Sequence, residues 1–139
     1  MLSVLQRSGE AQNTIILFCS DHGMPFPFSK ATCYEHGTRV PVLLSWPGMG
    51  KATEFSQVTE SVDILPTLLE LLDVPHPENI DGKSWLPIIN ENASREFAVT
   101  YINEISSGYA YPVRAIQDSR YSLIFSPWAD GKLNSRRSR

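Results

Sequence analysis

The sequence lacks the features of a membrane, nucleic-acid-binding or disulfide-rich protein. None of its 139 residues belongs to an apolar run of the roughly 20 residues needed to span a bilayer. The formal net charge is −3, and the only basic run, Arg136, Arg137 and Arg139, is a short tail of the kind that is usually solvated and disordered. Nucleic acid is therefore not an expected partner. Two cysteines, Cys19 and Cys33, are too few for a disulfide framework.

The first ten residues also lack the pattern of a secretory signal. Arg7 is not followed by a continuous apolar segment, which such a signal requires. We therefore expect either a cytosolic chain or a true N-terminus that lies upstream. What is present is a globular composition, with 42% hydrophobic and 19% charged residues, in a length that suits one ordinary domain.

The first 90 residues show the pattern of an α/β protein. Leu2 and Leu5 indicate a short helix that closes at Gly9, since glycine is common just past a helix end. The run 14–19 is continuously apolar and rich in β-branched residues, which is typical of a strand buried on both faces of a parallel sheet. A second buried strand is predicted at 40–46, with Pro41 at its first residue.

A helix is then predicted to begin at Asp63 as its N-cap and to end near Asp73. Leucines recur at helical spacing between these two positions, which indicates one apolar face. Pro66 falls in the first turn, where its missing N–H group costs little.

The pattern changes after residue 90. Three short strand-like runs, 98–102, 112–116 and 121–125, follow one another with turn residues between them. Strands in close succession without intervening helices favour an antiparallel sheet. We therefore predict an α/β portion at 1–90 and a small, partial antiparallel portion at 91–139 that carries the basic tail.

The first group with chemical potential is Asp21-His22, directly after the apolar run 14–19. The carboxyl end of a buried strand is where α/β proteins place their sites. A carboxylate and an imidazole there can both face a cation. Read alone, the dipeptide is a weak signal, and an aspartate that caps a turn beside a histidine on the surface is the more common arrangement.

A second group follows in the same loop. Lys30 comes after a segment braced by Pro25 and Pro27, and Glu35 and Arg39 lie just before the second strand. In isolation, Lys30 could simply face solvent, and Glu35 and Arg39 could form a structural ion pair.

Taken in order, these segments resemble the C-terminal half of the sulfatase catalytic domain. The series is Ser-Asp-His-Gly at 20–23, Lys30, Tyr-Glu-His-Gly-Thr-Arg-Val-Pro at 34–41, Trp-Pro-Gly at 46–48, Ser-Val-Asp-Ile-Leu-Pro-Thr-Leu-Leu at 61–69 and Asp-Gly-Lys-Ser-Trp-Leu-Pro at 81–87. Residues 115–122 are similar to the family's late strand pair. The Pro-Phe-Pro loop at 24–30 is most similar to the heparan N-sulfatase (sulfamidase) branch. The resemblance implies a partial alkaline-phosphatase-like α/β/α sandwich followed by a small antiparallel C-terminal subdomain.

The resemblance also implies chemistry. Sulfatases hydrolyse a sulfate ester or sulfamate with a formylglycine nucleophile and a divalent cation, usually calcium. By resemblance, Asp21 and His22 are metal ligands, Lys30 contacts the sulfate, and Glu35 and Arg39 support the pocket. Many sulfatases carry asparagine in place of His22, which leaves the metal's identity open. The implied substrate is a sulfated small molecule or glycan, and full-length relatives are commonly exported, periplasmic or lysosomal.

Two parts of the sulfatase pattern are absent. Neither Cys19 nor Cys33 begins the formylglycine motif Cys-x-Pro-x-Arg, and no Asp-Asp dipeptide, the family's other metal pair, occurs in the sequence. We therefore expect a sulfatase fragment that is inactive by itself, that has an exposed hydrophobic edge at 14–19 and that has an N-terminal sulfatase half as a possible partner. Two alternatives remain open: a non-catalytic module that binds a sulfated glycan or a protein, and a phosphodiesterase or phosphonate hydrolase of the same superfamily.

Overall fold

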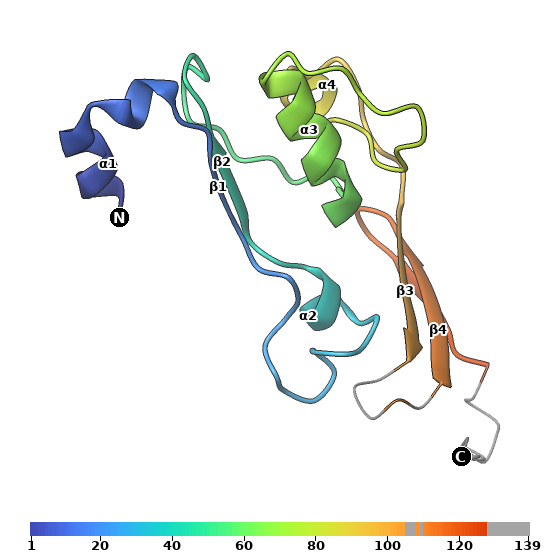
Figure 1. Ribbon diagram of the computed structural model, residues 1–139. Coiled ribbons are helices and arrows are strands. Elements are labelled where there is room, and N and C mark those ends of the chain that lie inside the picture. The colour runs from blue at the N-terminus through green and yellow to red at the C-terminus, as the bar shows by residue number, and fades with distance from the viewer. Residues whose placement is uncertain (105–107, 109, 128–139) are drawn as a thin grey trace. The chain divides into compact units, whose positions relative to one another are not determined.

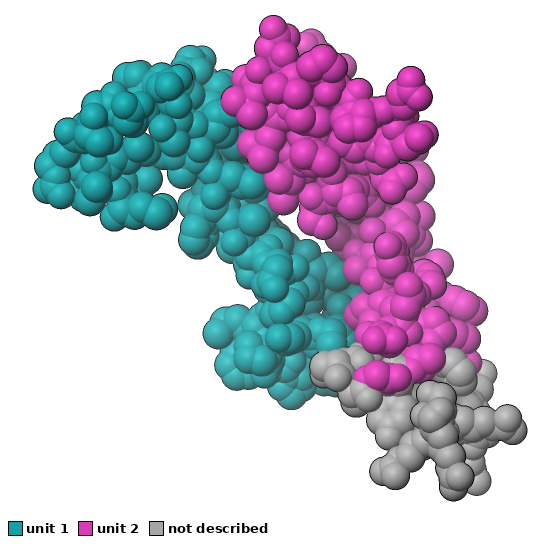
Figure 2. Space-filling model, in the orientation of Figure 1, with its two compact units in different colours: residues 1–54 teal, residues 55–139 magenta. Residues whose placement is uncertain are grey.

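The computed structural model describes residues 1–104, 108 and 110–127 (Figure 1). The chain forms two compact units, residues 1–54 and 55–139 (Figure 2). The predicted domain boundary at residue 90 falls inside the second unit and stays a prediction. The basic tail that contains Arg136, Arg137 and Arg139 lies outside the described residues.

The first unit begins with helix α1, Leu2–Ser8, and the 3₁₀ turn η1, Glu10–Asn13. The helix closes at Gly9, whose φ of 83° is in the left-handed region that glycine adopts without steric cost. Strand β1, Ile16–Cys19, then pairs with strand β2, Val42–Ser45. The predicted first helix and its glycine end are confirmed.

The predicted environment of the two strands is wrong. β1 and β2 are antiparallel, and within the described residues they form a sheet of their own. Phe18 and Leu43, which are partners in the register, are 59% and 65% exposed. Pro41 precedes β2 instead of opening it, and its carbonyl accepts a hydrogen bond from the Ser20 backbone at 3.4 Å. A run of apolar residues predicts an extended segment. Which strand pairs with that segment, and whether its faces are buried, depend on the rest of the fold.

The second unit places two helices before a three-stranded sheet. After the 3₁₀ turn η2, Ser61–Asp63, come helix α3, Ile64–Leu71, and helix α4, Leu86–Ile89. The sheet has the order β3-β4-β5 and is antiparallel throughout; its strands are Ala98–Glu104, Ala110–Gln117 and Ser122–Phe125. The three predicted strands and their antiparallel pairing are confirmed.

The sheet in this unit has one buried face and one exposed face, as the period of two in a strand requires. Ala98, Val113 and Ala115 are buried on the inner face. The opposite face carries large exposed side chains from all three strands: Val99, Tyr101, Ile116, Leu123 and Phe125. At its centre the Arg114 guanidinium lies 5.4 Å from the Tyr101 ring centroid.

Asp63 is the N-cap residue of α3, as predicted, but its side chain makes no capping hydrogen bond to that helix. Its side chain is fully buried, and its Oδ2 accepts the Glu60 backbone N–H at 2.9 Å as half of a capping box around η2. The same carboxylate accepts the Lys83 backbone N–H at 2.9 Å and the Trp85 indole N–H at 3.2 Å. These bonds attach the segment before α4 to the start of α3.

Arg95 completes this buried network. It donates to Asp63 Oδ1 at 2.8 Å and forms an ion pair with Glu60. Glu60 in turn accepts the Val99 backbone N–H of β3 at 2.7 Å. A buried carboxylate is costly unless it is paired and hydrogen-bonded, and here every oxygen has a donor. The network therefore connects helix α3 to the sheet.

Over the described ranges, no helix combines the length and the apolar character needed to cross a membrane.

Candidate functional site

The predicted site residues all lie on one long loop, residues 20–39, which leaves β1 and returns to β2 through the short helix α2, Glu35–Thr38. Two glycines let its ends meet. The Gly23 backbone N–H donates to the Gly37 carbonyl at 3.0 Å. A Cβ on Gly23 would lie 1.7 Å from the His36 carbonyl oxygen, and one on Gly37 would lie 2.3 Å from the Ser29 carbonyl oxygen. Only glycine fits at either position.

The interior of the loop is the only part of residues 1–54 that is buried. Ser29, Cys33 and Gly37 are the buried residues of this unit, all of which is described. The Ser29 hydroxyl donates to the His36 carbonyl at 2.7 Å, and the Thr32 hydroxyl donates to the Ser29 carbonyl at 2.6 Å. This packing gives the loop a fixed conformation, although it contains no strand.

Asp21 and His22 project from the start of this loop. Asp21 Oδ2 lies 3.4 Å from His22 Nε2, and the Asp21 side chain is exposed. His22 Nδ1 lies 2.8 Å from the Gly23 carbonyl oxygen. Both neighbours of the ring are acceptors and the Gly23 oxygen is the closer one, so we assign the proton of the neutral ring to Nδ1 and the lone pair to Nε2. The lone pair and the carboxylate are therefore available side by side.

This arrangement fits one side of a cation site. A ligating histidine usually donates its other ring N–H to a backbone carbonyl or carboxylate, as His22 does to Gly23. Across the described part of the chain, however, no cluster of three or more His, Cys, Asp or Glu side chains could hold a metal ion. Calcium takes about 6–8 oxygen ligands, so the pair needs further ligands from substrate, water or another polypeptide segment.

Lys30 lies on the same loop, beyond the turn that its own backbone N–H closes onto the Met24 carbonyl at 3.1 Å. Its side chain is exposed. Its ammonium forms no ion pair with any described carboxylate. An unpaired ammonium on a fixed loop is suited to an anionic group.

Glu35 and Arg39 form an ion pair of 2.9 Å across one turn of α2. Both side chains are mostly exposed, and such pairs contribute little to stability. This geometry fits a structural ion pair, one of the two roles that the sequence allows. The other role, support of a sulfate pocket, stays a prediction.

The structure brings an aromatic pair into this loop that sequence reasoning missed. The rings of Phe28 and Tyr34 meet edge to face, with centroids 5.4 Å apart. Phe28 has a φ of 61°, which is unusual for a bulky residue. The sequence signal is weak, because two aromatics six positions apart in a proline-rich loop have no periodicity that predicts a contact.

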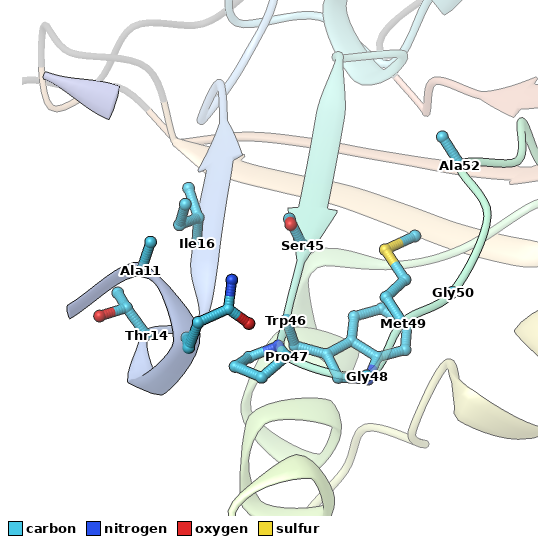
Figure 3. A pocket seen from close by; sticks show the side chains of 11 residues that line it. Ala11, Thr14, Ile16, Ser45, Trp46, Pro47, Gly48, Met49, Gly50 and Ala52 are labelled. Atoms are coloured by element: carbon cyan, nitrogen blue, oxygen red, sulfur yellow. The ribbon is translucent and has the colours of Figure 1, made fainter. Parts of the chain in front are cut away.

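The same unit contains a cavity of about 320 Å³ (Figure 3). It is lined by η1, the first residue of β1 and the turn that holds Trp46 and Met49. None of the predicted site residues lines it. The candidate site is therefore an exposed loop surface and not this cavity.

The family model "N-sulphoglucosamine sulphohydrolase, C-terminal" matches residues 21–129. The chain is 39% identical over 100 residues to arylsulfatase K of Gallus gallus, covering 69% of this chain and 19% of that protein. It is 31% identical over 134 residues to an ulvan-active sulfatase of Formosa agariphila, covering 88% and 26%. It is 28% identical over 139 residues to N-sulphoglucosamine sulphohydrolase of Homo sapiens, covering 89% and 27%.

Solved structures share the fold. A putative sulfatase from Bacteroides thetaiotaomicron matches with a TM-score of 0.76 and 23% identity, over 88% of this chain and 29% of that one. A phosphonate monoester hydrolase from Silicibacter pomeroyi matches with a TM-score of 0.75 and 20% identity, over 90% and 29%. The predicted fold class is confirmed. The chain spans between 19% and 29% of the length of these proteins.

Proposed function

The chain belongs to the sulfatase family described as N-sulphoglucosamine sulphohydrolase, C-terminal, and on that basis we propose that it carries one side of the cation and sulfate site of a metal-dependent sulfatase. The observation that carries the proposal is the loop 20–39. It holds an aspartate, a histidine with its Nε2 lone pair available, and a lysine that pairs with no described carboxylate, all on one packed segment.

In this proposal Asp21 and His22 hold a divalent cation, and Lys30 binds a sulfate oxygen. The bound cation would neutralise charge that develops on the sulfate group during hydrolysis. The carboxylate of Asp21 favours calcium, whereas the imidazole of His22 also suits softer metals. Lys30 adds a compact positive charge without a fixed bidentate geometry.

The substrate we propose is a sulfate ester or sulfamate of a sugar. One relative is named for the sulfated sugar N-sulphoglucosamine, and another is named as a sulfatase active on ulvan. The fold is also shared with a phosphonate monoester hydrolase, so the fold alone does not select sulfate over phosphonate. The sequence relatives favour sulfate.

The nucleophile and the remaining metal ligands would come from a second sulfatase part. Neither cysteine has the formylglycine motif, and the pair of aspartates is absent from the sequence. We therefore propose that the 139-residue chain binds its ligands but does not turn them over by itself. A non-catalytic sulfated-glycan module would show the same binding, and only the addition of such a second part would separate the two functions.

The test is a binding titration followed by amide NMR signals. Glucosamine N-sulfate with calcium should shift signals of residues 21–30 in the unaltered chain. Asp21→Asn should remove the calcium response, and Lys30→Ala should weaken the response to sugar. The matched controls, Glu54→Gln and Lys51→Ala, change exposed charges of the same unit and should alter neither.

A turnover assay completes the test. Hydrolysis of a chromogenic aryl sulfate by this chain, lost on Asp21→Ala, would contradict the proposed absence of a nucleophile. A response to calcium and sugar that is unchanged in Asp21→Asn and Lys30→Ala would contradict the proposed site itself.

A further inference from the structure

The outer surface of the loop 20–39 is apolar as well as charged. Met24, Phe26 and Phe28 are 66%, 63% and 66% exposed, and Tyr34 is 47% exposed. Large exposed apolar patches beside polar groups are typical of binding surfaces. These side chains share the loop with Lys30, so an apolar surface and a positive charge occur on one packed segment.

The backbone fixes Phe28 and Lys30 on this outer surface. Ser29, between them, is buried and donates its hydroxyl to the His36 carbonyl at 2.7 Å. The neighbours of this inward anchor are both exposed. The Ser29 backbone N–H also donates to the Phe26 carbonyl at 3.2 Å. The buried Ser29 side chain thus keeps the two residues that flank it, Phe28 and Lys30, on the outer surface of the loop.

The backbone conformation of Phe28 is strained, and burial of its side chain offsets little of that strain. Its φ of 61° is in a region that bulky side chains rarely adopt. The ring nevertheless remains 66% exposed, so little apolar surface is buried in return. Backbone conformations of this kind concentrate at ligand sites, where the surrounding structure maintains them.

Tyr34 orients the exposed ring. Its ring packs edge to face against Phe28, with an interplanar angle of 82° and centroids 5.4 Å apart, which is a favourable aromatic geometry. An edge contact leaves a face of the Phe28 ring available to a second flat, apolar surface. The C–H face of a pyranose ring is such a surface, and a sulfate on that sugar would carry the charge that Lys30 complements.

We propose that Phe28, oriented by Tyr34, is a sugar-ring platform that sets the preference for sulfated saccharides over free sulfate. This inference rests on the proposed function, because Lys30 supplies the contact to the sulfate. Phe28 touches the sugar, and Tyr34 is a positioning residue that acts through Phe28.

The experiment measures binding of the full 139-residue chain to two probes in the presence of calcium: glucosamine N-sulfate and inorganic sulfate. Phe28→Ala should weaken sugar binding about fivefold, since an aromatic contact contributes about 1 kcal/mol and 1.4 kcal/mol corresponds to tenfold. Inorganic sulfate binding should not change. Tyr34→Ala should weaken sugar binding less, and Tyr34→Phe, which keeps the ring, should restore it.

Phe26→Ala is the matched control, because Phe26 is equally exposed on the same loop but is not part of the ring pair. Retention of the residue 20–39 amide signals shows that each variant keeps the loop folded. If Phe28→Ala loses these signals, Phe28→Leu is measured in its place, because leucine removes the aromatic ring and keeps apolar volume.

The outcomes separate this inference from the proposed function. One outcome is sugar binding that depends on Lys30 but has the same affinity in Phe28→Ala and Phe26→Ala. This outcome overturns the platform and leaves the proposed function standing. Sugar binding that depends on Phe28 but not on Lys30 supports the platform and contradicts the sulfate contact. Absence of sugar binding by the unaltered chain overturns both.

Discussion

The Arg95 guanidinium lies 2.8 Å from the Asp63 carboxylate, and the two side chains are 15% and 0% exposed. This pair is the centre of a hydrogen-bond network in the second unit. Asp63 also accepts hydrogen bonds from Trp85 and Lys83, and Arg95 also forms an ion pair with Glu60. Its burial sets it apart from the Glu35–Arg39 pair on α2, which is exposed to solvent.

The two ion pairs should respond very differently to removal of one partner. Asp63→Ala leaves a buried guanidinium with one partner and an indole N–H with none, so we expect it to lower the free energy of unfolding by about 3–5 kcal/mol. Glu35→Ala should cost less than about 1 kcal/mol. Urea denaturation followed by circular dichroism measures both. Equal midpoints for the two variants would show that the Asp63 network does not hold the unit together.

The packing of the candidate loop should depend on Gly37. A methyl group there would meet the Ser29 carbonyl oxygen at 2.3 Å, so Gly37→Ala should force the loop apart at a cost of about 1–3 kcal/mol. Amide NMR signals of residues 20–39 should shift. Gly82→Ala, which would meet the Val62 carbonyl oxygen at 2.1 Å in the other unit, should disturb signals of residues 60–64 instead. Unchanged Ser29 and Thr32 signals in Gly37→Ala would rule out this packing.

His22 should bias the choice of metal. His22→Asn replaces a ring nitrogen with an amide oxygen, which calcium prefers. We therefore expect the affinity for manganese or zinc relative to calcium to fall about tenfold or more. Loss of a residue that only hydrogen-bonds to a metal ligand already lowers metal affinity about 10–100-fold. Competition titrations against a metal indicator dye measure this ratio. His36→Asn, an exposed histidine of the same loop, is the control. A ratio that changes equally in both variants would argue against His22 as a ligand.

The turn between β4 and β5 should be sensitive to acid. The Asp118 carboxylate accepts the backbone N–H groups of Arg120 and Tyr121, both at 2.6 Å. These bonds to the charged form, with a smaller contribution from the Arg120 charge, lower the pKa of Asp118 below its usual range.

The sign of the pH dependence follows from this direction. The folded state binds the Asp118 proton less tightly than the unfolded state, so the contribution to stability is present above the unfolded pKa and is lost as the pH falls through the lower folded pKa. An NMR titration of the Arg120 and Tyr121 amide signals should show this midpoint below about 3.9, the usual aspartate value. Asp118→Asn should abolish the titration of both amides. A midpoint at or above the usual value would refute the assignment of these bonds.

Much of the chain's local structure could be predicted from the sequence. The glycine end of α1, the extent of α3 to within two residues of Asp73, and the three late strands all depend on neighbours in sequence. The ordered series from Asp21 to Pro87 also indicated the sulfatase family, which the family model confirms. Such features can be predicted because apolar periodicity, caps and turn residues act over a few positions.

The sequence by itself determined the helices α1 and α3, the extended segments, and which loop carries Asp21, His22 and Lys30, whereas the short helices α2 and α4 were not predicted. Only the tertiary structure decided that β1 pairs antiparallel with β2, that the Asp63 side chain is buried against Arg95 instead of accepting hydrogen bonds from the first turn of α3, and that Phe28 meets Tyr34. The physical reason is that pairing, burial and ring contacts join residues that are distant in sequence. Their energies depend on which groups meet in space, and local pattern does not contain that information.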